Sequence, residues 1–444
     1  MKGIVYICHH IDTEGPLYEN HSELINRINY VTGLNLSKDE NLSSQINQIE
    51  KTLGDKEKKE LRAVVNPHVV NLLGDWSEVD KTISKVTSKE FREQMLDSYG
   101  NSWVFNWHIM DHVGFTGANP RRRDLGHHKI WEYYRSKLTS KTHSYDGFHW
   151  HFHPIGFDKH AHIPATSYEN SMTELHQIIC RRLVDYCWFP CVNRAGFHSI
   201  RWDSNNFLES WIPFDPSNQS VSEEYQPELQ RDLSNGRFGD WRGAPSDWSI
   251  YNPSIRDWRK KGEMNRYIAR VLNMSSRHRN ISESEIEKAF ARASRGLDTY
   301  LGITNHDWRD MAFEINEFRH MLKTVSERYK EVDFKFSETK SAFRNILFSK
   351  VELEEHNHLE FSVKLENNNL NIHVTKGKIF GPQPYLAIKT KSGKYLHDNF
   401  DFGDNDNSYK YCFDEYTILT NQLEAVVVAA NDKFGNQYIK KLDF

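Results

Sequence analysis

Long apolar runs are missing from this sequence of 444 residues. None approaches the roughly 18 residues that a membrane-spanning helix needs, so we expect no membrane span. The apolar stretch GIVYIC at residues 3–8 is too short for a secretory signal, and no small-residue cleavage site follows it. Cysteine is also scarce. The five cysteines show no paired metal-binding spacing, and an odd count without an export signal predicts free thiols in a reducing cytoplasm.

A strong net charge of either sign is absent as well. Lys and Arg total 57 against 61 Asp and Glu, which leaves a formal net charge of −4. Such a balance provides no general attraction to nucleic acid or acidic membranes. Aromatic residues are plentiful by contrast, with 12 Trp, 20 Tyr and 25 Phe. Their rings suit a hydrophobic core and also the walls of a cleft for polar ligands such as sugars.

Two regions differ in their hydrophobic pattern. Up to about residue 345, strand-like and helix-like stretches alternate, which predicts an α/β fold with a parallel sheet in a closed or nearly closed barrel of about seven repeats. Within it, the stretch 61–73 begins as strand-like and then has no clear pattern. Residues 216–285, rich in Trp, Pro, Gly and Asn, are predicted to form a long insertion over one face. Residues 350–444 alternate with period two between turn signals, which predicts a small β-sandwich-like domain.

Polar residues follow the predicted strands of the first region. Functional side chains of a parallel barrel gather at the carboxyl ends of its strands. We therefore expect one site to be shared by the strand ends HHIDTEG, NWHIMDHVG, FHWHFHP, NRAGFH, FDPS and ITNHDWRD.

The stretch FHWHFHP is the most informative of these. His149, His151 and His153 alternate, so in a strand all three point to the same face. Imidazole nitrogens together with carboxylates form a ligand set for a divalent ion, with zinc the first choice and nickel, cobalt or manganese as alternatives. Spacing does not decide which two of the three histidines bind, because i,i+2 and i,i+4 pairs are both feasible.

Acids come from HHIDTEG, where Asp12 and Glu14 share a face of the strand end. One of them can bind the metal while the other stays free as a base. His10 alternates onto the Asp12 face and is a further neighbour. Arg194 in NRAG is a candidate for orienting a carboxylate, and His306 in ITNHDW is a candidate general acid. Asp111, at the end of the second strand, is a candidate for the substrate side of the site, with no assigned role.

In this order, the motifs resemble those of the polysaccharide deacetylase family, the carbohydrate esterases with NodB homology. IDTEGP resembles the family's first motif, GFHWHFHP the second, NRAG the third, the stretch through IPFDPS the next and LGITNH the last. The resemblance covers roughly residues 1–345 and implies a distorted (β/α)₇ barrel. It implies Asp12 as base, Glu14 with His149 and His153 as metal ligands, His151 as an additional candidate ligand, Arg194 beside the base, Asp215 beside the site, and His306 as acid.

The sequence departs from the family's commonest pattern in several places. The acids of the first motif are separated by Thr13 instead of being adjacent aspartates, the second motif carries a third histidine, and neither the Trp-rich insertion nor the C-terminal β domain belongs to the family's core. These departures bear on ligand geometry and on the substrate more than on the fold.

The function implied is a metal-dependent deacetylase that acts on an N-acetylated sugar or glycan precursor of surface polysaccharide metabolism. Metal-bound water would attack the amide, Asp12 would take its proton and His306 would protonate the leaving amine. Trp241 and Arg242 in the insertion are candidates for binding the sugar and a charged group on it. Two alternatives stay open: a hydrolase of another non-peptide C–N bond in a small amide, and a non-catalytic carbohydrate-binding protein.

Overall fold

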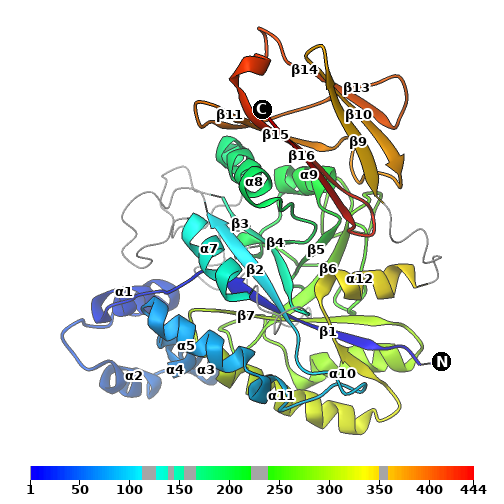
Figure 1. Ribbon diagram of the computed structural model, residues 1–444. Helices are drawn as coiled ribbons and strands as arrows, with labels where there is room; N and C mark the ends of the chain where they lie inside the picture. Colours follow the sequence, from blue (N-terminus) through cyan, green and yellow to red (C-terminus); the bar gives the residue numbers. More distant parts are fainter. Residues whose placement is uncertain (1, 113–126, 139–144, 155–166, 222–238, 350–358) are drawn as a thin grey trace.

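The computed structural model describes residues 2–112, 127–138, 145–154, 167–221, 239–349 and 359–444. These residues form a nearly closed parallel barrel followed by two antiparallel sheets packed as a sandwich (Figure 1). The predicted fold class is therefore confirmed.

The barrel strands run in the order β4-β3-β2-β1-β7-β6-β5, with β8 also paired to β1, and all these pairs are parallel. A parallel bridge between Val192 and Phe214 joins the β4 and β5 ends of the sheet. Their neighbouring residues Ala195 and Ser217 are also hydrogen-bonded, from the backbone N–H to Oγ at 2.9 Å. The strands are β1 Val5–Thr13, β2 Phe105–His112, β3 Gly147–His153, β4 Asn193–Ala195, β5 Phe214–Asn218, β6 Tyr267–Asn273, β7 Thr299–His306 and β8 Phe334–Phe336.

Strand β1 lies at the centre of the barrel wall, and all nine of its residues are buried. Parallel sheets are covered on both faces, which is why the first four residues of this strand are apolar and its polar residues His9, His10, Asp12 and Thr13 are buried as well. Its outward residues Val5, Ile7 and Ile11 join the core beneath the surrounding helices. Side chains alternate along a strand, so His10 and Asp12 point into the barrel.

Capping residues determine where the helices begin and end, as α1 illustrates. Asn20 and Glu23 form a capping box at the start of α1, and Gly33 ends that helix with a positive φ of 74°. None of the described helices is long and apolar enough to cross a membrane. The helices are α1 His21–Thr32, α2 Leu42–Glu50, α3 Asp55–Val65, α4 Pro67–Val70, α5 Trp76–Thr87, α6 Lys89–Arg92, α7 His127–Leu138, α8 Met172–Tyr186, α9 Trp202–Trp211, α10 Glu283–Ser294, α11 Met311–Arg328 and α12 Thr339–Phe348, with 3₁₀ turns η2 Glu169–Ser171, η3 Gly196–His198 and η6 Thr420–Gln422.

Two predicted elements differ from the structure. Residues 61–73, expected to begin as strand-like, contain the end of α3 and all of α4, because apolar residues at helical spacing pack into a satellite core with α1. The predicted insertion 216–285 contains β6, a strand of the barrel. Its short apolar run is interrupted by Arg270, whose charge is paired on the outside with Glu285 of α10. Residues 222–238 of the predicted insertion lie outside the described residues.

The C-terminal sandwich packs on the barrel through α8 and α9 (Figure 1). Its sheets have the orders β13-β14-β10-β9 and β12-β11-β15-β16. Tyr385 and Tyr395 reach the barrel side, where they bond His176 Nδ1 at 2.8 Å and Asp185 at 2.9 Å. The strands are β9 Glu360–Glu366, β10 Asn369–Lys376, β11 Tyr385–Thr390, β12 Tyr395–Asp398, β13 Asp401–Phe402, β14 Ser408–Cys412, β15 Leu423–Asn431 and β16 Gln437–Asp443.

Candidate metal centre

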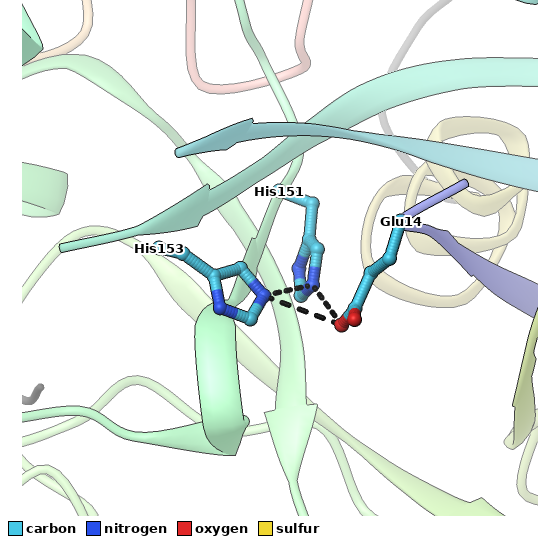
Figure 2. Close-up of side chains that lie close together, drawn as sticks. All are labelled: Glu14, His151 and His153. Atoms are coloured by element: carbon cyan, nitrogen blue, oxygen red, sulfur yellow. Dashed lines mark hydrogen bonds and ion pairs between the residues drawn. The ribbon is translucent and has the colours of Figure 1, made fainter. Parts of the chain in front are cut away.

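Three buried side chains converge at the carboxyl ends of β1 and β3. The His151 and His153 Nε2 atoms lie 2.8 Å apart, and Glu14 Oε1 lies 3.9 Å from the first and 3.5 Å from the second (Figure 2). Zinc bonds of about 2.0 Å at tetrahedral angles would put ligand atoms about 3.3 Å apart. The three donors therefore form a group that could hold a metal ion.

The His151 ring is oriented by the backbone. Its Nδ1 lies 2.8 Å from the carbonyl oxygen of Arg194, so Nδ1 carries the proton and donates it. The lone pair of Nε2 is then directed toward Glu14 and His153, which is the tautomer that a metal ligand needs. Burial alone would lower the pKa of His151, but the carboxylates of Asp12 and Glu14 outweigh burial and raise it.

Asp12 lies beside this group and is held by Arg194. The guanidinium Nε donates to Asp12 Oδ1 at 2.6 Å, and both side chains are fully buried. Nη1 and Nη2 of the same guanidinium contact the Pro216 carbonyl and His198 Nδ1, at 2.9 and 3.0 Å. Asp12 Oδ2 has no hydrogen-bond partner among the described residues. One oxygen of the carboxylate is thus fixed while the other remains available, as a general base requires.

His306, the last residue of β7, faces both carboxylates. Its Nε2 lies 3.9 Å from Asp12 Oδ2 and 3.8 Å from Glu14 Oε1. Its side chain is 20% exposed, whereas the side chains of Asp12, Glu14, His151 and His153 are at most 6% exposed, so His306 is the most solvent-accessible of the five. Burial lowers the pKa of His306 to about 4, which leaves the ring neutral at neutral pH.

Asp307 supports the turn that carries Glu14, a contact that the sequence reading did not foresee. Its carboxylate accepts the backbone N–H groups of Glu14 and Gly15 at 2.9 and 2.8 Å, and the Tyr134 hydroxyl at 2.6 Å. Burial raises its pKa to about 6. The available signal was an acid directly after His306, which must point to the opposite side of the chain.

Gly196 in the NRAG motif provides space for a ligand ring. A Cβ at this position would lie 2.8 Å from ring atoms of His153 and 2.6 Å from the Phe152 carbonyl oxygen. The next residue, Phe197, packs edge-on against the His153 ring, with centroids 4.7 Å apart. The motif therefore serves both halves of the site: its arginine holds Asp12 and its glycine admits His153.

His149 points into the barrel like His151 and His153 but lies in a deeper layer. Its Nε2 lies 3.1 Å from Glu338 Oε1 and 3.2 Å from Asn106 Oδ1. Both partners are oxygen acceptors, so this nitrogen carries a proton and its lone pair is not available. The structure thus groups His151 and His153 with Glu14 and leaves His149 outside the group.

The deeper layer also contains His10. Its Nδ1 lies 2.7 Å from His108 Nε2, and its Nε2 lies 2.8 Å from the Tyr300 hydroxyl. Burial is the main reason why the pKa values of His10 and His108 fall well below the ordinary value. His10 therefore lies below Asp12 as a neutral hydrogen-bonded side chain.

Two predicted substrate-side acids lie on the outer face of the barrel. Asp111 pairs with Arg182 of α8 and accepts the Trp150 indole N–H at 3.1 Å. Asp215 pairs with Arg266 at 2.6 Å and with the Ser217 hydroxyl at 2.5 Å. Both acids are fully buried and neutralised by arginine. The structure does not bring either of them to the metal group, because strand alternation turns them away from the interior.

The predicted sugar-binding pair of the insertion is divided between interior and surface. Trp241 is 1% exposed and donates its indole N–H to the His198 carbonyl at 2.8 Å, so it helps to hold the loop behind Arg194. The Arg242 side chain is 60% exposed and pairs with Asp240 at 2.9 Å. Of the two, Arg242 is the one that a ligand in solvent can reach.

Comparisons with known proteins add little to this geometry. Neither the models of known families nor the curated proteins match the sequence. Among solved structures, a Cellulomonas fimi endo-beta-1,4-mannanase double mutant is similar to this chain with a TM-score of 0.27 and 10% sequence identity, over 77% of this chain and 86% of that one. A likeness at this TM-score carries no argument about function.

Proposed function

We propose that the chain is a metal-dependent hydrolase that removes the acetyl group from an N-acetylated sugar or glycan precursor. One observation carries the proposal: the Glu14, His151 and His153 donors converge beside the buried carboxylate of Asp12. Arg194 fixes one oxygen of this carboxylate, and the other has no hydrogen-bond partner in the described ranges. The order of motifs resembling the deacetylase family supports the same assignment. The acetylated sugar itself comes only from that resemblance.

Glu14, His151 and His153 would hold the ion. A divalent cation bound there would supply Lewis acidity and lower the pKa of water toward neutrality. A buried carboxylate with two imidazoles is a donor set typical of zinc, with an open position left for substrate. Nickel, cobalt and manganese accept the same donors.

The remaining residues divide the proton transfers. Asp12 Oδ2 is placed to take the proton of the attacking water, since Arg194 already occupies Oδ1. His306 Nε2 lies 3.9 Å from that oxygen and is neutral at rest, so it can receive the proton and deliver it to the leaving amine. Water's hydroxyl ends on the acetyl carbon, the C–N bond breaks, and acetate and the free amine leave.

The test is acetate release from a panel of N-acetylated mono- and oligosaccharides by metal-loaded protein and by protein treated with a chelator. We expect release only from the loaded protein. Hydrolysis of small cyclic amides without any acetate release would assign the chain to another C–N bond instead. Saturable glycan binding without turnover by fully loaded protein would identify a carbohydrate-binding protein and contradict the proposed reaction.

A further inference from the structure

An aromatic cavity of about 220 Å³ lies on the outer face of the barrel, away from the metal group. Its strand residues, Trp107 of β2 and Phe148 of β3, alternate with the inward-facing His108 and His149, so they point to the opposite side of the barrel wall. Helix α7 and the end of α8 complete it. The five rings that line it belong to Trp107, Trp131, Phe148, Tyr186 and Trp188.

The rings form a preformed box. Trp131 packs edge-on against Phe148 and Trp188, with centroid distances of 5.0 and 4.9 Å, and lies 5.4 Å from Tyr186. A cavity of about 150 Å³ is enough to hold one benzene. This cavity therefore has room for one six-membered ring and a small substituent.

Two donors of the cavity, the Trp131 indole and the Arg135 guanidinium, have no acceptor among the described residues. The Trp131 residue is 1% exposed, and within the described part of the chain its indole N–H has no hydrogen-bond partner. Arg135 has no carboxylate partner among the described residues, and its guanidinium lies 4.6 Å from the centre of the Tyr186 ring. An unmet buried donor is costly, which makes the Trp131 N–H a point of attraction for a ligand oxygen.

The carboxylate in the cavity wall is already neutralised. Asp146 pairs with Arg92 at 2.6 Å and accepts the Phe105 backbone N–H and the Trp107 indole N–H, at 3.0 and 3.1 Å. It therefore offers little to a cation. The cavity is therefore an apolar box with one buried donor, the Trp131 N–H, and one exposed positive charge, Arg135, at its edge.

From this arrangement we infer that the aromatic cavity binds a single-ring carboxylate, with the ring between the aromatic side chains and the carboxylate on the Trp131 N–H and Arg135. Ligand sites of this kind are typically apolar pockets with a few placed polar groups. Two sources share the chemistry: a hexuronate unit of an acidic glycan and a small aryl acid. The site is independent of the proposed hydrolytic reaction.

The test uses the exposed thiol of Cys187, which also lines the cavity. Full-length Cys412→Ser protein removes the other exposed thiol, and the alkylation rate of Cys187 is then measured with benzoate, glucuronate, and the uncharged ring controls benzyl alcohol and glucose. We expect saturable protection by at least one acid, at a concentration at least tenfold below that of its neutral control. Protection by benzoate alone identifies an aryl acid, and protection by glucuronate alone identifies an acidic glycan.

Two variants test the donors. Arg135→Gln, at an exposed position that the fold tolerates, should abolish the preference for the acid over its neutral control. Trp131→Phe keeps a ring and should weaken binding about tenfold, with tryptophan fluorescence and the unfolding midpoint checked for an intact fold. No protection by either acid, equal protection by acid and neutral ring, or an unchanged preference in Arg135→Gln would overturn the inference.

Discussion

Two layers of histidines occupy the same barrel interior and differ in what surrounds them. In the upper layer, His151 and His153 face each other and Glu14 across distances that an ion can bridge. In the lower layer, the deeper one, His10 and His108 are hydrogen-bonded to each other, and His10 is also bonded to the Tyr300 hydroxyl. His149 is bonded to the amide oxygen of Asn106. Buried histidines alone therefore do not make a metal site. Donor atoms that converge on one point, including a carboxylate oxygen, are also needed.

The two layers also differ in charge. Although burial opposes it, the acids above raise the pKa of His151, whereas burial without an adjacent acid lowers the pKa values of His10 and His108. At the base of the barrel, burial alone would raise the pKa of Glu338, but His149 outweighs it and lowers that pKa to about 2. Among the described residues, the acid of the lower layer is thus Glu338, and it is already paired with His149.

The largest expected difference between the two layers is in the metal content of their alanine variants. We expect His151→Ala and His153→Ala to lose stoichiometric metal, because each removes one of the three convergent donors. His149→Ala is the matched control from the same strand face and should keep its metal. Elemental analysis of the purified, zinc-reconstituted proteins measures this. Loss of metal from a folded His149→Ala protein would show that the lower layer also binds.

Asp12→Asn should separate holding the ion from moving the proton. The amide keeps an oxygen for Arg194 Nε but no longer accepts a proton, so metal content should be retained while turnover falls by about 10² to 10⁴, the usual contribution of general acid–base catalysis. Steady-state rates of acetate release from an N-acetylated substrate, together with elemental analysis, provide the measurement. Turnover equal to that of the unmutated chain at full metal loading would exclude Asp12 as the base.

Asp307→Asn should affect the upper layer through the turn that carries Glu14. The amide keeps one acceptor for two backbone N–H groups, so Glu14 loses part of its support. Outer partners of metal ligands typically contribute 10- to 100-fold in metal affinity, and we expect a loss in that range from competition with a chromophoric chelator. Tyr134→Phe, which removes only the 2.6 Å hydroxyl contact, should lose less. Unchanged affinity in Asp307→Asn would mean that the carboxylate only stabilises the fold.

The free energy of unfolding should fall at acid pH through the lower layer and at alkaline pH through the upper layer. His108 has a folded pKa below its unfolded value, so its contribution to the free energy of unfolding is complete above about pH 6.5 and is lost as the pH falls. His151 has a raised pKa, so its contribution is complete below about pH 6.5 and is lost as the pH rises through the folded pKa.

His108→Gln should therefore flatten the acid limb and His151→Gln the alkaline limb, each by at most about 1.4 kcal/mol per pH unit. Urea unfolding of chelator-treated protein over this pH range measures both slopes. An acid limb that is equally steep in His108→Gln and the unmutated chain would contradict a neutral, buried His108.

Much of the barrel could be read from sequence because burial on both faces produces recognisable apolar strands. The strand β6 could not, since Arg266 and Arg270 interrupt the pattern, and only the partners Asp215 and Glu285 make their burial possible. Similarly, the acid of Asp111 looked like part of a site because it ends a strand. Asp111 lies two and four residues after Ile109 and Trp107, so it shares their face of the strand. Both of these residues are buried in the outer core, which implied that Asp111 points outward as well.

The sequence by itself determined that His149, His151 and His153 share one face of a strand and that Asp12 and Glu14 end another, because strand periodicity is a local property of the backbone. Only the tertiary structure decided which histidines meet an acid. Two residues along a strand cover about 6.6 Å, enough to move a side chain into another layer of the barrel. Strand register, a long-range property, places Glu14 beside His151 and His153 and places Glu338, from the far end of the barrel sequence, beside His149.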